Sequence, residues 1–506
     1  MIVIEALFLF CIVFLCIYGL NSLVLVFLYL RHRDDPTPSP LPPAEWPRVT
    51  VQLPVYNELH IIERLLTAAA ALDYPRDRCE FQMLDDSTDE TRQIAAQAVA
   101  RLQEQGINVV HITRPNREDY KAGALAAGLA KARGELIAIF DADFVPPAGF
   151  LRRVVPHFAD PGVGCVQTRW GHLNRDYSPL TRAQALGIDG HFVVEQTARS
   201  RAGLFLNFNG TGGVWRRDCI ADAGGWQGDT LTEDLDLSYR AQLRGWRIAY
   251  LPDVVVPAEV PVQISALKRQ QARWAQGSIE TALKLIGPLL RSRQPGLVKL
   301  EGIIHLTGYL VHPLMLLAIL LILPMSFSNS WVLSVSPWLM GMAAGPPLLY
   351  LVAQRGKPWS HRLRLLPLLE LLGIGLALNN TWAVARGILG IRQGFLRTPK
   401  FALLEPADRW VSRQYALSGA PFIWGELLLS LFAATLVIVP VVNAGFVPWL
   451  FLYAGSFGYV AGVSLYQSRQ LRRWLATQPR SAPHREGRIP ASGPGCTRAD
   501  CAGPGR

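Results

Sequence analysis

The chain has 506 residues, of which 50% are hydrophobic, with 14 Trp and a formal net charge of +11. Together with a positive mean hydropathy of +0.19, this apolar content exceeds what one water-soluble core requires, so part of it is expected to face lipid. The sequence shows neither an aromatic and basic RNA-binding motif nor a DNA-reading helix pattern. The positive charge is therefore attributed to membrane topology and anionic lipid, and nucleic acid is excluded as a partner.

The first 30 residues form one long apolar segment. From Ile2 to Leu30 the only acid is Glu5, and the segment is long enough to cross a hydrocarbon core of about 30 Å. A cleavable signal peptide would have an apolar region of about half this length, with basic residues before it and a small-residue cleavage site after it. Residues 1–33 are therefore predicted to be transmembrane helix 1, and the Pro-rich residues 34–47 a stiff linker.

Short strand and helix patterns alternate in the next region, residues 48–262. Four strands are predicted, at residues 49–55, 81–84, 108–112 and 136–140. Helices are predicted between them, at residues 59–72, 88–105 and 120–132. This order predicts a doubly wound α/β domain, in which ligands bind beyond the carboxyl ends of the strands.

Acids follow two of these strands. Asp85 and Asp86 come after the second strand, and Asp141 and Asp143 after the fourth, so their carboxylates are expected to converge on one crevice. Two carboxylates one residue apart on an extended segment reach a hard divalent cation and the oxygens of a diphosphate together. The alternative is that Asp141 and Asp143 cap a helix before Pro146. Asp86 has a similar alternative, as the N-cap of the following helix.

Two later helices carry polar motifs. Thr232-Glu233-Asp234 places two acids in a first helical turn, where they complement the helix dipole; alternatively, one carboxylate takes the proton of an acceptor hydroxyl as a general base. In the second motif, a helix brings Gln270, Arg273 and Trp274 onto one face. Arg can hold a diphosphate and an indole can stack on a sugar, whereas an amphipathic interfacial helix is the simpler alternative.

The second half of the chain holds further apolar stretches, roughly at residues 302–323, 331–352, 366–389 and 424–466, the last broken near Val442, Asn443 and Gly445. Since basic residues prefer the cytosolic side, the basic residues at 31–33 place the α/β domain in the cytosol. A crossing at 366–389 would put two basic loops outside. That segment is therefore predicted to lie in, or re-enter from, the cytosolic interface, which gives five crossings.

Residues within 366–389 support this assignment, because Glu370, Asn379, Asn380 and Arg386 are costly at bilayer depth unless they are buried in protein.

The remaining predicted segments are interfacial helices at 263–300, transmembrane helices 2 and 3 at 301–354, an interfacial or re-entrant segment with a basic loop at 355–418, transmembrane helices 4 and 5 at 419–468, and a basic disordered tail at 469–506. The seven Cys are scattered without metal-ligand spacing, which indicates a reducing compartment.

The order of these features resembles the processive family 2 glycosyltransferases, whose members include cellulose synthases and plant mannan and glucomannan synthases. The resemblance covers Val49 to about Tyr466 and rests on seven motifs in order, at residues 53–58, 85–87, 121–125, 141–143, 208–211, 232–234 and 270–274. It implies a doubly wound GT-A-type nucleotide-sugar transferase domain inserted between transmembrane α-helices, in a multi-pass protein of a bacterial inner or plasma membrane.

The resemblance also implies roles for single residues. On the donor side, Tyr56, Glu58 and Asp86 would contact the nucleoside, Lys121 the diphosphate, and Asp143, with Asp141 nearby, the sugar nucleotide and its Mg²⁺ or Mn²⁺. On the acceptor side, Asp234 would be the catalytic base beside Glu233. Gln270, Arg273 and Trp274 would hold the diphosphate and the acceptor end, and the loop Asn209-Gly210-Thr211 would border the acceptor. The implied reaction is a single in-line displacement with inversion.

Product and donor remain open at this level, with UDP-glucose and GDP-mannose both compatible. The Asn-Gly-Thr loop and the single leading helix resemble the mannan and glucomannan branch, and residues 397–401 take the place of the family's gating loop, an ordinary basic loop being the alternative. A polymer synthase that exports its glycan, with envelope or export proteins as partners, is the favoured interpretation. The alternatives are a non-processive transferase that forms a glycolipid, such as glucosyl-diacylglycerol or glucosylceramide, and a transporter or scaffold with an inactive transferase fold.

Overall fold

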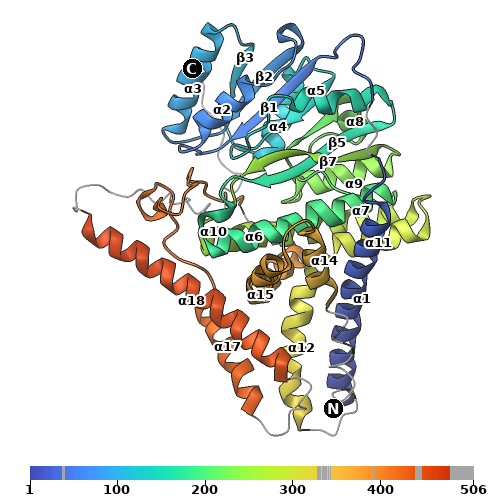
Figure 1. The fold of residues 1–506 in the computed structure, drawn as a ribbon, viewed down its shortest axis with the longest axis vertical. Coiled ribbons are helices and arrows are strands. Elements are labelled where there is room, and N and C mark those ends of the chain that lie inside the picture. Colours follow the sequence, from blue (N-terminus) through green and yellow to red (C-terminus); the bar gives the residue numbers. More distant parts are fainter. Residues whose placement is uncertain are drawn as a thin grey trace, which may run out of the picture.

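The computed structural model describes residues 1–36, 40–327, 344–391, 394–438 and 447–478, and the single residues 332, 339 and 341. An α/β domain lies at one end, a layer of helices lies beneath it, and long apolar helices extend away from that layer (Figure 1). The first helix, α1 (Ile2–His32), begins at the far end of the apolar helices and ends beside the helix layer and the α/β domain.

The α/β domain is built on a seven-stranded sheet in the order β3-β2-β1-β4-β6-β5-β7. The strands are β1 (Val49–Val55), β2 (Cys79–Asp85), β3 (Val109–Thr113), β4 (Leu136–Ile139), β5 (Val163–His172), β6 (Gly213–Arg216) and β7 (Arg247–Ala258). β1 is parallel to both of its neighbours, β2 and β4, whereas β6 is antiparallel to β4 and to β5. The predicted doubly wound α/β domain is confirmed, and β5, β6 and β7 extend it into a mixed sheet.

The centre of this sheet is buried on both faces. Val51 and Leu53 of β1 are fully buried, and so are the polar side chains of Thr50 and Gln52. Thr50 donates to Glu80 over 2.6 Å and Gln52 to Gln82 over 3.0 Å, so these polar groups keep hydrogen bonds inside the sheet. Parallel strands covered on both faces require such near-continuous burial.

Crossover helices connect the parallel strands and create the crevice. They are α2 (Ile62–Ala70), α3 (Thr91–Glu104) and α4 (Tyr120–Lys131). The chain leaves β1 toward β2 and β3 on one side and returns to β4 on the other side of β1. The carboxyl ends of β1 and β4 therefore border a topological switch point, where α/β sheets bind ligands.

Helices cover the side of the α/β domain that faces the apolar helices. This layer contains α6 (Pro179–Asp189), the π-helix η4 (Gly190–Glu195), α7 (Gln196–Arg201), α9 (Glu233–Leu243), α10 (Ile264–Arg291) and α11 (Gly296–Leu306). The predicted helices at Thr232-Glu233-Asp234 and at the Gln270 to Trp274 motif are thus present as α9 and α10. α10 is 28 residues long, and it packs against α9 above and α16 (Ala377–Leu389) below.

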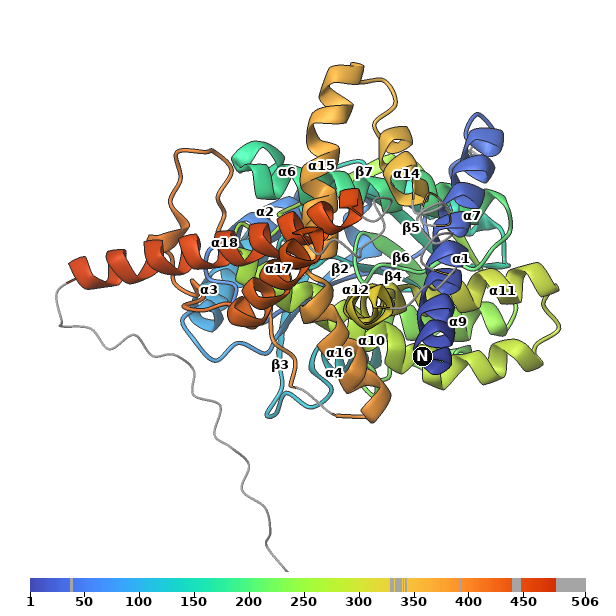
Figure 2. The same ribbon diagram turned by 90° about the horizontal axis from the view of Figure 1, so that it is seen from below.

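The apolar helices are α1, α12 (Val311–Ser326), α14 (Gly345–Ala353), α15 (Trp359–Gly375), α16, α17 (Ile423–Ile438) and α18 (Val447–Thr477). α12 lies between α1 and the pair α17 and α18 (Figures 1 and 2). Among the described residues, two helical segments are long and apolar enough to cross a membrane, Ile2–His32 and Gly308–Ser326. A third results if Arg362–Gly375 and Ala377–Leu389, which are bent by 43°, form one span.

The bend divides the segment that was assigned to the interface. A helix pair with this bend is either a broken span or a re-entrant loop, so the predicted five crossings stay a prediction. The polar groups of this segment do find protein partners: Asn379 donates to the Lys268 carbonyl over 3.0 Å, and Asn380 to His312 over 2.9 Å. Residues 331, 333–338, 340, 342 and 343 of the predicted span at 331–352, and the break near Val442, Asn443 and Gly445, lie outside the described residues.

The boundary predicted for the basic tail is wrong at its start. α18 continues through Arg469, Arg472 and Arg473 to Thr477, where residues from 469 onward were expected to be disordered. The reason is tertiary: Leu471 is buried in a cluster with Phe401 and other residues of the preceding loop, which holds the last turns of α18 in place. Residues 479–506, which make up the rest of the predicted tail, lie outside the described residues.

A buried ion pair joins α10 to the apolar helices. Lys268 and Glu426 of α17 both have fully buried side chains, and the Lys268 Nζ lies 2.7 Å from a Glu426 carboxylate oxygen. Lys268 Nζ also donates to the Ser464 hydroxyl of α18 over 3.2 Å and to the Pro421 carbonyl over 3.1 Å. All three ammonium protons therefore have acceptors, which is the condition under which a buried charge is tolerated.

Removal of one member of this pair is expected to destabilise the protein strongly. Lys268→Met leaves the Glu426 carboxylate buried without its cation, at a cost of about 3–5 kcal/mol. The double variant Lys268→Met/Glu426→Leu replaces both charges by apolar groups and should recover most of that loss. Thermal unfolding of the detergent-solubilised variants measures this, and a double variant no more stable than Lys268→Met would contradict the assignment.

Candidate active site

The residues singled out from the sequence gather at the carboxyl ends of β1, β2 and β4. They line one cavity of about 170 Å³, with Thr211 as the exception. The lining includes Tyr56, Glu58, Asp86, Lys121, Asp141, Asp143, Asn209, Gly210, Glu233, Asp234, Gln270, Arg273 and Trp274. Thr211 is fully buried beneath the cavity, where its hydroxyl accepts the Asp141 backbone N–H over 2.9 Å and so fixes the start of the Asp141-Ala142-Asp143 segment.

Asp86 lies at the end of β2 and is held by an arginine from the loop after β3. Arg114 donates to its two carboxylate oxygens over 3.0 Å and 2.6 Å, a bidentate pair. The helix that follows begins only at Thr91, with Glu90 at its N-cap. The alternative of Asp86 as an N-cap is therefore wrong, because its carboxylate is turned into the cavity and paired there.

Lysines neutralise the two acids after β4. The Lys121 Nζ lies 2.5 Å from the Asp141 carboxylate and also donates to the Gly210 carbonyl over 2.9 Å. The Lys400 Nζ lies 2.5 Å from the Asp143 carboxylate. The next helix, α5 (Phe150–Val154), has Gly149 at its N-cap, so the helix-capping alternative for Asp141 and Asp143 is also wrong.

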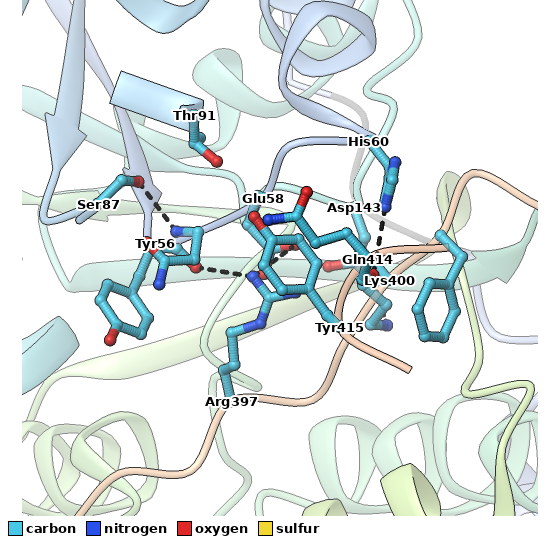
Figure 3. A network of polar contacts seen from close by, with 12 residues as sticks. Tyr56, Glu58, His60, Ser87, Thr91, Asp143, Arg397, Lys400, Gln414 and Tyr415 are labelled. Atoms are coloured by element: carbon cyan, nitrogen blue, oxygen red, sulfur yellow. Dashed lines mark hydrogen bonds and ion pairs between the residues drawn. The ribbon is translucent and has the colours of Figure 1, made fainter. Parts of the chain in front are cut away.

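Lys400 belongs to residues 394–415, called here the covering loop, and four residues of this loop line the cavity: Phe395, Arg397, Thr398 and Lys400. Figure 3 shows Arg397, Lys400, Gln414 and Tyr415 of this loop near Tyr56, Glu58 and Asp143. Lys400 donates to the Glu259 carbonyl, and the Glu259 carboxylate accepts the backbone N–H groups of Phe401 and Ala402 over 3.3 Å and 3.2 Å. Arg397 donates to the Tyr56 carbonyl over 3.2 Å and lies 3.8 Å from the Glu58 carboxylate. The loop is thus tied to strand ends on both sides of the crevice.

The far end of the covering loop is fastened to the α/β domain as well. The Tyr415 hydroxyl donates to the Asp89 carboxylate, and the Gln414 carbonyl lies 3.3 Å from the His60 Nε2. The Arg397 guanidinium stacks on the Tyr415 ring, 4.0 Å from its centre.

Burial raises the pKa of Glu58 to about 8, even though Arg397 acts in the opposite direction, so this carboxyl is mainly protonated at neutral pH.

Asp234 lies in the first turn of α9, facing the loop at Asn209 and Gly210. Burial, and next the charge of Glu233, raise the pKa of Asp234 well above the ordinary Asp value of about 4. Gly210 has φ +82°, and a Cβ there would lie 2.9 Å from an Asp234 carboxylate oxygen. Only glycine fits both the backbone conformation and this close approach.

Hydrogen bonds from α9 hold that loop. The Ser238 hydroxyl accepts the Phe208 N–H over 2.9 Å, and the Gln242 side chain pairs with both backbone groups of Leu206, over 3.1 Å and 2.7 Å. The Asn209 side chain accepts from Gln196 over 2.7 Å and lies 3.0 Å from the His191 Nε2, so helices η4 and α7 also fix it. Asn209 and Gly210 are consequently placed by tertiary contacts from two directions.

α10 brings its motif to the same cavity. Gln270, Arg273 and Trp274 line it from one helix face, as predicted. α10 approaches α9 closely at Gly277, where a Cβ would lie 2.6 Å from the Thr232 Cγ2 and 2.8 Å from the Thr232 backbone nitrogen. This contact sets the distance between the helix that carries Asp234 and the helix that carries Arg273.

Sequence reasoning missed several residues of this cavity, and Arg117 is the most informative. Its guanidinium lies 3.4 Å from the centre of the Tyr56 ring, 5.0 Å from that of Tyr120 and 5.5 Å from that of Phe395. Among the described residues its Nε has no hydrogen-bond partner. Arg114 and Glu259 were also missed, because no local pattern marks them and their roles depend on Asp86 and on the covering loop.

A second and larger cavity adjoins the first. It has a volume of about 970 Å³ and extends among α1, α12, α15 and α18. The two cavities share the lining residues Trp170, Ile188, Asn209, Asp234, Gln270 and Trp274. Asp234 therefore lies on the wall between a small, charged cavity at the strand ends and a large, mainly apolar one among the apolar helices.

The small cavity has the chemistry to bind a negatively charged phosphate compound. Lys121, Arg117 and Arg273 supply cationic donors, and Asp141 and Asp143 supply oxygen ligands. No group of three or more His, Cys, Asp or Glu side chains placed to hold a metal occurs among the described residues. Two carboxylates fit the type of Mg²⁺ or Mn²⁺ site that is completed by the oxygens of a bound diphosphate.

The chain is similar in sequence to known proteins. A protein-family model described as "Glycosyltransferase like family 2" matches residues 47–277. The chain is 41% identical over 256 residues to glucomannan 4-beta-mannosyltransferase 2 of Arabidopsis thaliana, covering 50% of this chain and 48% of that protein. It is 38% identical over 283 residues to glucomannan 4-beta-mannosyltransferase 1 of Oryza sativa subsp. japonica, covering 54% of each. The chain thus spans about half the length of these curated relatives.

A solved structure shares the fold. It is a mannosyltransferase from Pyrobaculum calidifontis in complex with GDP-Man and Mn²⁺, with a TM-score of 0.53 and 23% sequence identity, and the match covers 77% of this chain and 100% of that one. The α/β domain is therefore of the GT-A type, as the sequence resemblance implied.

The Gly277 contact gives a test of the site's framework. Alanine at a helix-interior glycine ordinarily stabilises by about 0.5–1 kcal/mol, but overpacking costs about 1–3 kcal/mol. Gly277→Ala should therefore lower the thermal midpoint, since the new methyl meets the Thr232 backbone. Gly462→Ala in α18 is the matched control, because Gly462 is also interior to a helix and a Cβ there has no atom within 4 Å. A Gly277→Ala protein as stable as the control would show that α9 and α10 do not meet this closely.

Proposed function

We propose that this chain is a membrane β-glycosyltransferase that moves a hexose from a nucleotide sugar onto a growing glycan, and the match of residues 47–277 to the model described as "Glycosyltransferase like family 2" supports this. The observation that carries the proposal is the position of Asp234 between the two cavities. A donor in the small cavity and a glycan end in the large one would meet at this carboxylate. The names of the similar plant enzymes favour mannose as the sugar, with GDP-mannose as donor and UDP-glucose as the alternative.

The proposed reaction is a single displacement. An acceptor hydroxyl oxygen attacks the anomeric carbon, the bond from that carbon to the diphosphate breaks, and the nucleoside diphosphate leaves with the bonding electrons. Asp234 takes the hydroxyl proton, and its raised pKa suits a general base, which works best with a pKa near the working pH. Attack from the side opposite the leaving group inverts the anomeric carbon, so an α-linked donor gives a β-linked product.

Cationic side chains would stabilise the departing diphosphate. Lys121 lies on the Asp141 side of the cavity, and Arg273 lines it from α10, next to Gln270. Burial lowers the pKa of Lys121, but Asp141 and Glu233 outweigh that effect and keep the side chain cationic. Preorganised charges directed at the leaving group act strongly where water is excluded.

A divalent cation, Mg²⁺ or Mn²⁺, is proposed as the cofactor, held by Asp143 and Asp141. When bound, it would neutralise charge on the diphosphate. Asp143 already forms an ion pair with Lys400, whose Nζ lies 2.5 Å from the Asp143 carboxylate. Cation binding would therefore require Lys400 to leave, which would release one attachment of the covering loop.

The large cavity supports a polymer over a glycolipid product. Its walls come from helices α1, α12, α15 and α18, and its volume of about 970 Å³ is at the upper end of the range of small-molecule pockets. A glycan leaving Asp234 through this cavity would pass among the apolar helices and away from the α/β domain. Processive synthesis coupled to export, with the catalytic domain in the cytosol and the amino terminus outside, is the proposed arrangement.

One experiment tests both the proposed polymer product and the proposed role of Asp234 as the catalytic base. Purified protein in lipid vesicles is incubated with radiolabelled GDP-mannose or UDP-glucose, and the label is followed into retained polymer or into chloroform extract. The wild type should give polymer, and Asp234→Asn should lower transfer by about 10²–10⁴-fold, the usual contribution of a general base, while still binding donor. Extraction of all label into chloroform would refute the proposed polymer product. Unimpaired transfer by the Asp234→Asn protein would refute the assignment of Asp234 as the general base.

Lys400 and the cation should compete for Asp143. Lys400→Met removes a charged hydrogen bond of the kind that contributes about 1.5–3 kcal/mol, so it should tighten Mn²⁺ binding to the nucleotide-free protein by about tenfold or more. Electron paramagnetic resonance of free Mn²⁺ measures this without any turnover. Lys299→Met on α11 is the control with no expected change, and Asp143→Asn should abolish the gain. Equal affinity of wild type and Lys400→Met would exclude the competition.

A further inference from the structure

The helical segment that runs from α6 to α7 contains a π-helix, η4. Such turns are rare, and they occur frequently at functional sites. Packing holds η4 on two sides: the Phe192 ring stacks on the Trp170 ring with 5.0 Å between their centres, and a Cβ at Gly190 would lie 2.6 Å from the ring of Tyr350 on α14. The polar side chains of η4 therefore start from a fixed backbone.

Two of these side chains connect η4 to the loop beside Asp234. The His191 Nδ1 lies 2.8 Å from the Glu195 carboxylate, and the His191 Nε2 lies 3.0 Å from the Asn209 Nδ2. Both ring nitrogens of His191 are thus engaged, one by η4 itself and the other by the loop. The reaction as proposed above uses neither His191 nor Glu195.

A backbone carbonyl, which can only accept, fixes the direction of each hydrogen bond. The Gln196 Nε2 donates to the Asn207 carbonyl over 2.8 Å, and the same amide nitrogen donates to the Asn209 Oδ1 over 2.7 Å. The Asn209 Nδ2 therefore faces the His191 Nε2 and donates to it. A neutral His191 then carries its proton on Nδ1 and donates it to Glu195.

One amide proton of Asn209 has no acceptor in the part of the chain that the structure describes. A carboxamide has two N–H groups, and the hydrogen bond to His191 uses one of them. Asn209 lines both cavities, and at the adjacent Gly210 a Cβ would lie 2.9 Å from an Asp234 carboxylate oxygen. The second N–H is thus available close to the place where an acceptor hydroxyl lies when Asp234 takes its proton.

We propose that His191 and Glu195 are positioning residues for the transfer reaction, which hold the Asn209 carboxamide so that its second N–H donates to the acceptor sugar beside Asp234. The inference rests on the proposed function, since it requires an acceptor at this carboxylate. Glu195 keeps the proton of His191 on Nδ1. In the other tautomer two N–H donors would face each other, and the Asn209 amide would turn away. The pair thereby orients the acceptor through Asn209.

A double-mutant cycle tests whether His191 acts through Asn209. The full chain in lipid vesicles is given the donor that the wild type uses, at saturation, and the rate of label transfer into polymer and chloroform extract together is measured. Asn209→Ala and His191→Leu should each lower this rate by about tenfold, equivalent to about 1.4 kcal/mol. The double variant should also lose about tenfold, because His191 then has no amide to orient, whereas independent effects would multiply to about a hundredfold.

Binding of GDP or UDP, followed by Trp fluorescence, is the second readout. It should be unchanged in the His191 and Glu195 variants, because both residues line only the large cavity and Trp170 and Trp274 report from the small one.

Conservative variants should recover activity. His191→Gln should regain most of the rate, since its amide oxygen can accept the hydrogen bond from Asn209, and Glu195→Gln should lose less than Glu195→Leu because it keeps an acceptor. His157→Leu in η2 (Val155–Ala159) is the matched control with no expected change, because His157 lines neither cavity.

Several outcomes would overturn the inference. A loss of about a hundredfold in the double variant would show that His191 acts independently of Asn209. His191→Gln protein as slow as His191→Leu protein, or weaker nucleotide binding in His191→Leu, would indicate a general disturbance of the fold. Full activity of Asn209→Ala would remove the group through which the pair acts. Where His191→Leu does not fold, Glu195→Gln takes its place in the cycle.

The same preparations separate this inference from the proposed function. Wild-type protein that transfers no sugar from GDP-mannose or UDP-glucose contradicts the proposed function. An active wild type in which the losses of Asn209→Ala and His191→Leu multiply contradicts only the positioning role of His191 and Glu195.

Discussion

The packing of α10 against both halves of the molecule is the constraint on which the arrangement of the site depends. One end of this helix is held by the buried Lys268 and Glu426 pair, which connects it to α17 and α18. Further along, the absence of a side chain at Gly277 lets α10 touch Thr232 at the start of α9. Arg273 and Trp274 lie between these two fixed points, so their positions relative to Asp234 follow from helix rigidity. A single helix thereby relates the strand-end cavity to the cavity among the apolar helices.

Charge compensation is the second organising feature. Asp86, Asp141 and Asp143 each have a cationic partner, and these partners come from three separate segments, with Arg114 after β3, Lys121 on α4 and Lys400 on the covering loop. Glu58 differs, since its nearest cation, the Arg397 guanidinium, lies 3.8 Å away and burial raises the pKa of Glu58 to about 8. The cavity therefore combines carboxylates that are paired with cations and a carboxyl group whose pKa is raised by burial, and perturbed groups of this kind are typical of functional sites.

Local patterns in the sequence were sufficient for much of the fold and the site. Alternating apolar runs predicted β1 to β4 to within a few residues, and helix spacing placed Gln270, Arg273 and Trp274 on one face. The alternative roles of Asp86, Asp141 and Asp143 as helix caps could not be rejected in the same way, because capping and ligand binding favour the same residue types. Only the pairing with Arg114, Lys121 and Lys400 distinguished them. The extent of α18 was likewise underestimated, since a basic sequence gives no sign that Leu471 packs on Phe401.

By itself the sequence determined the type of fold, the apolar helices and the identity of the acids at the strand ends, because these depend on periodicity and on the ends of predicted strands. The tertiary structure alone decided that the covering loop reaches Asp143, that Asp234 separates two cavities, and that His191 reaches Asn209. Lys400 and Asp143, for example, are 257 positions apart in the sequence. Contacts of that kind arise from packing of the whole chain, and no local pattern of residues encodes them.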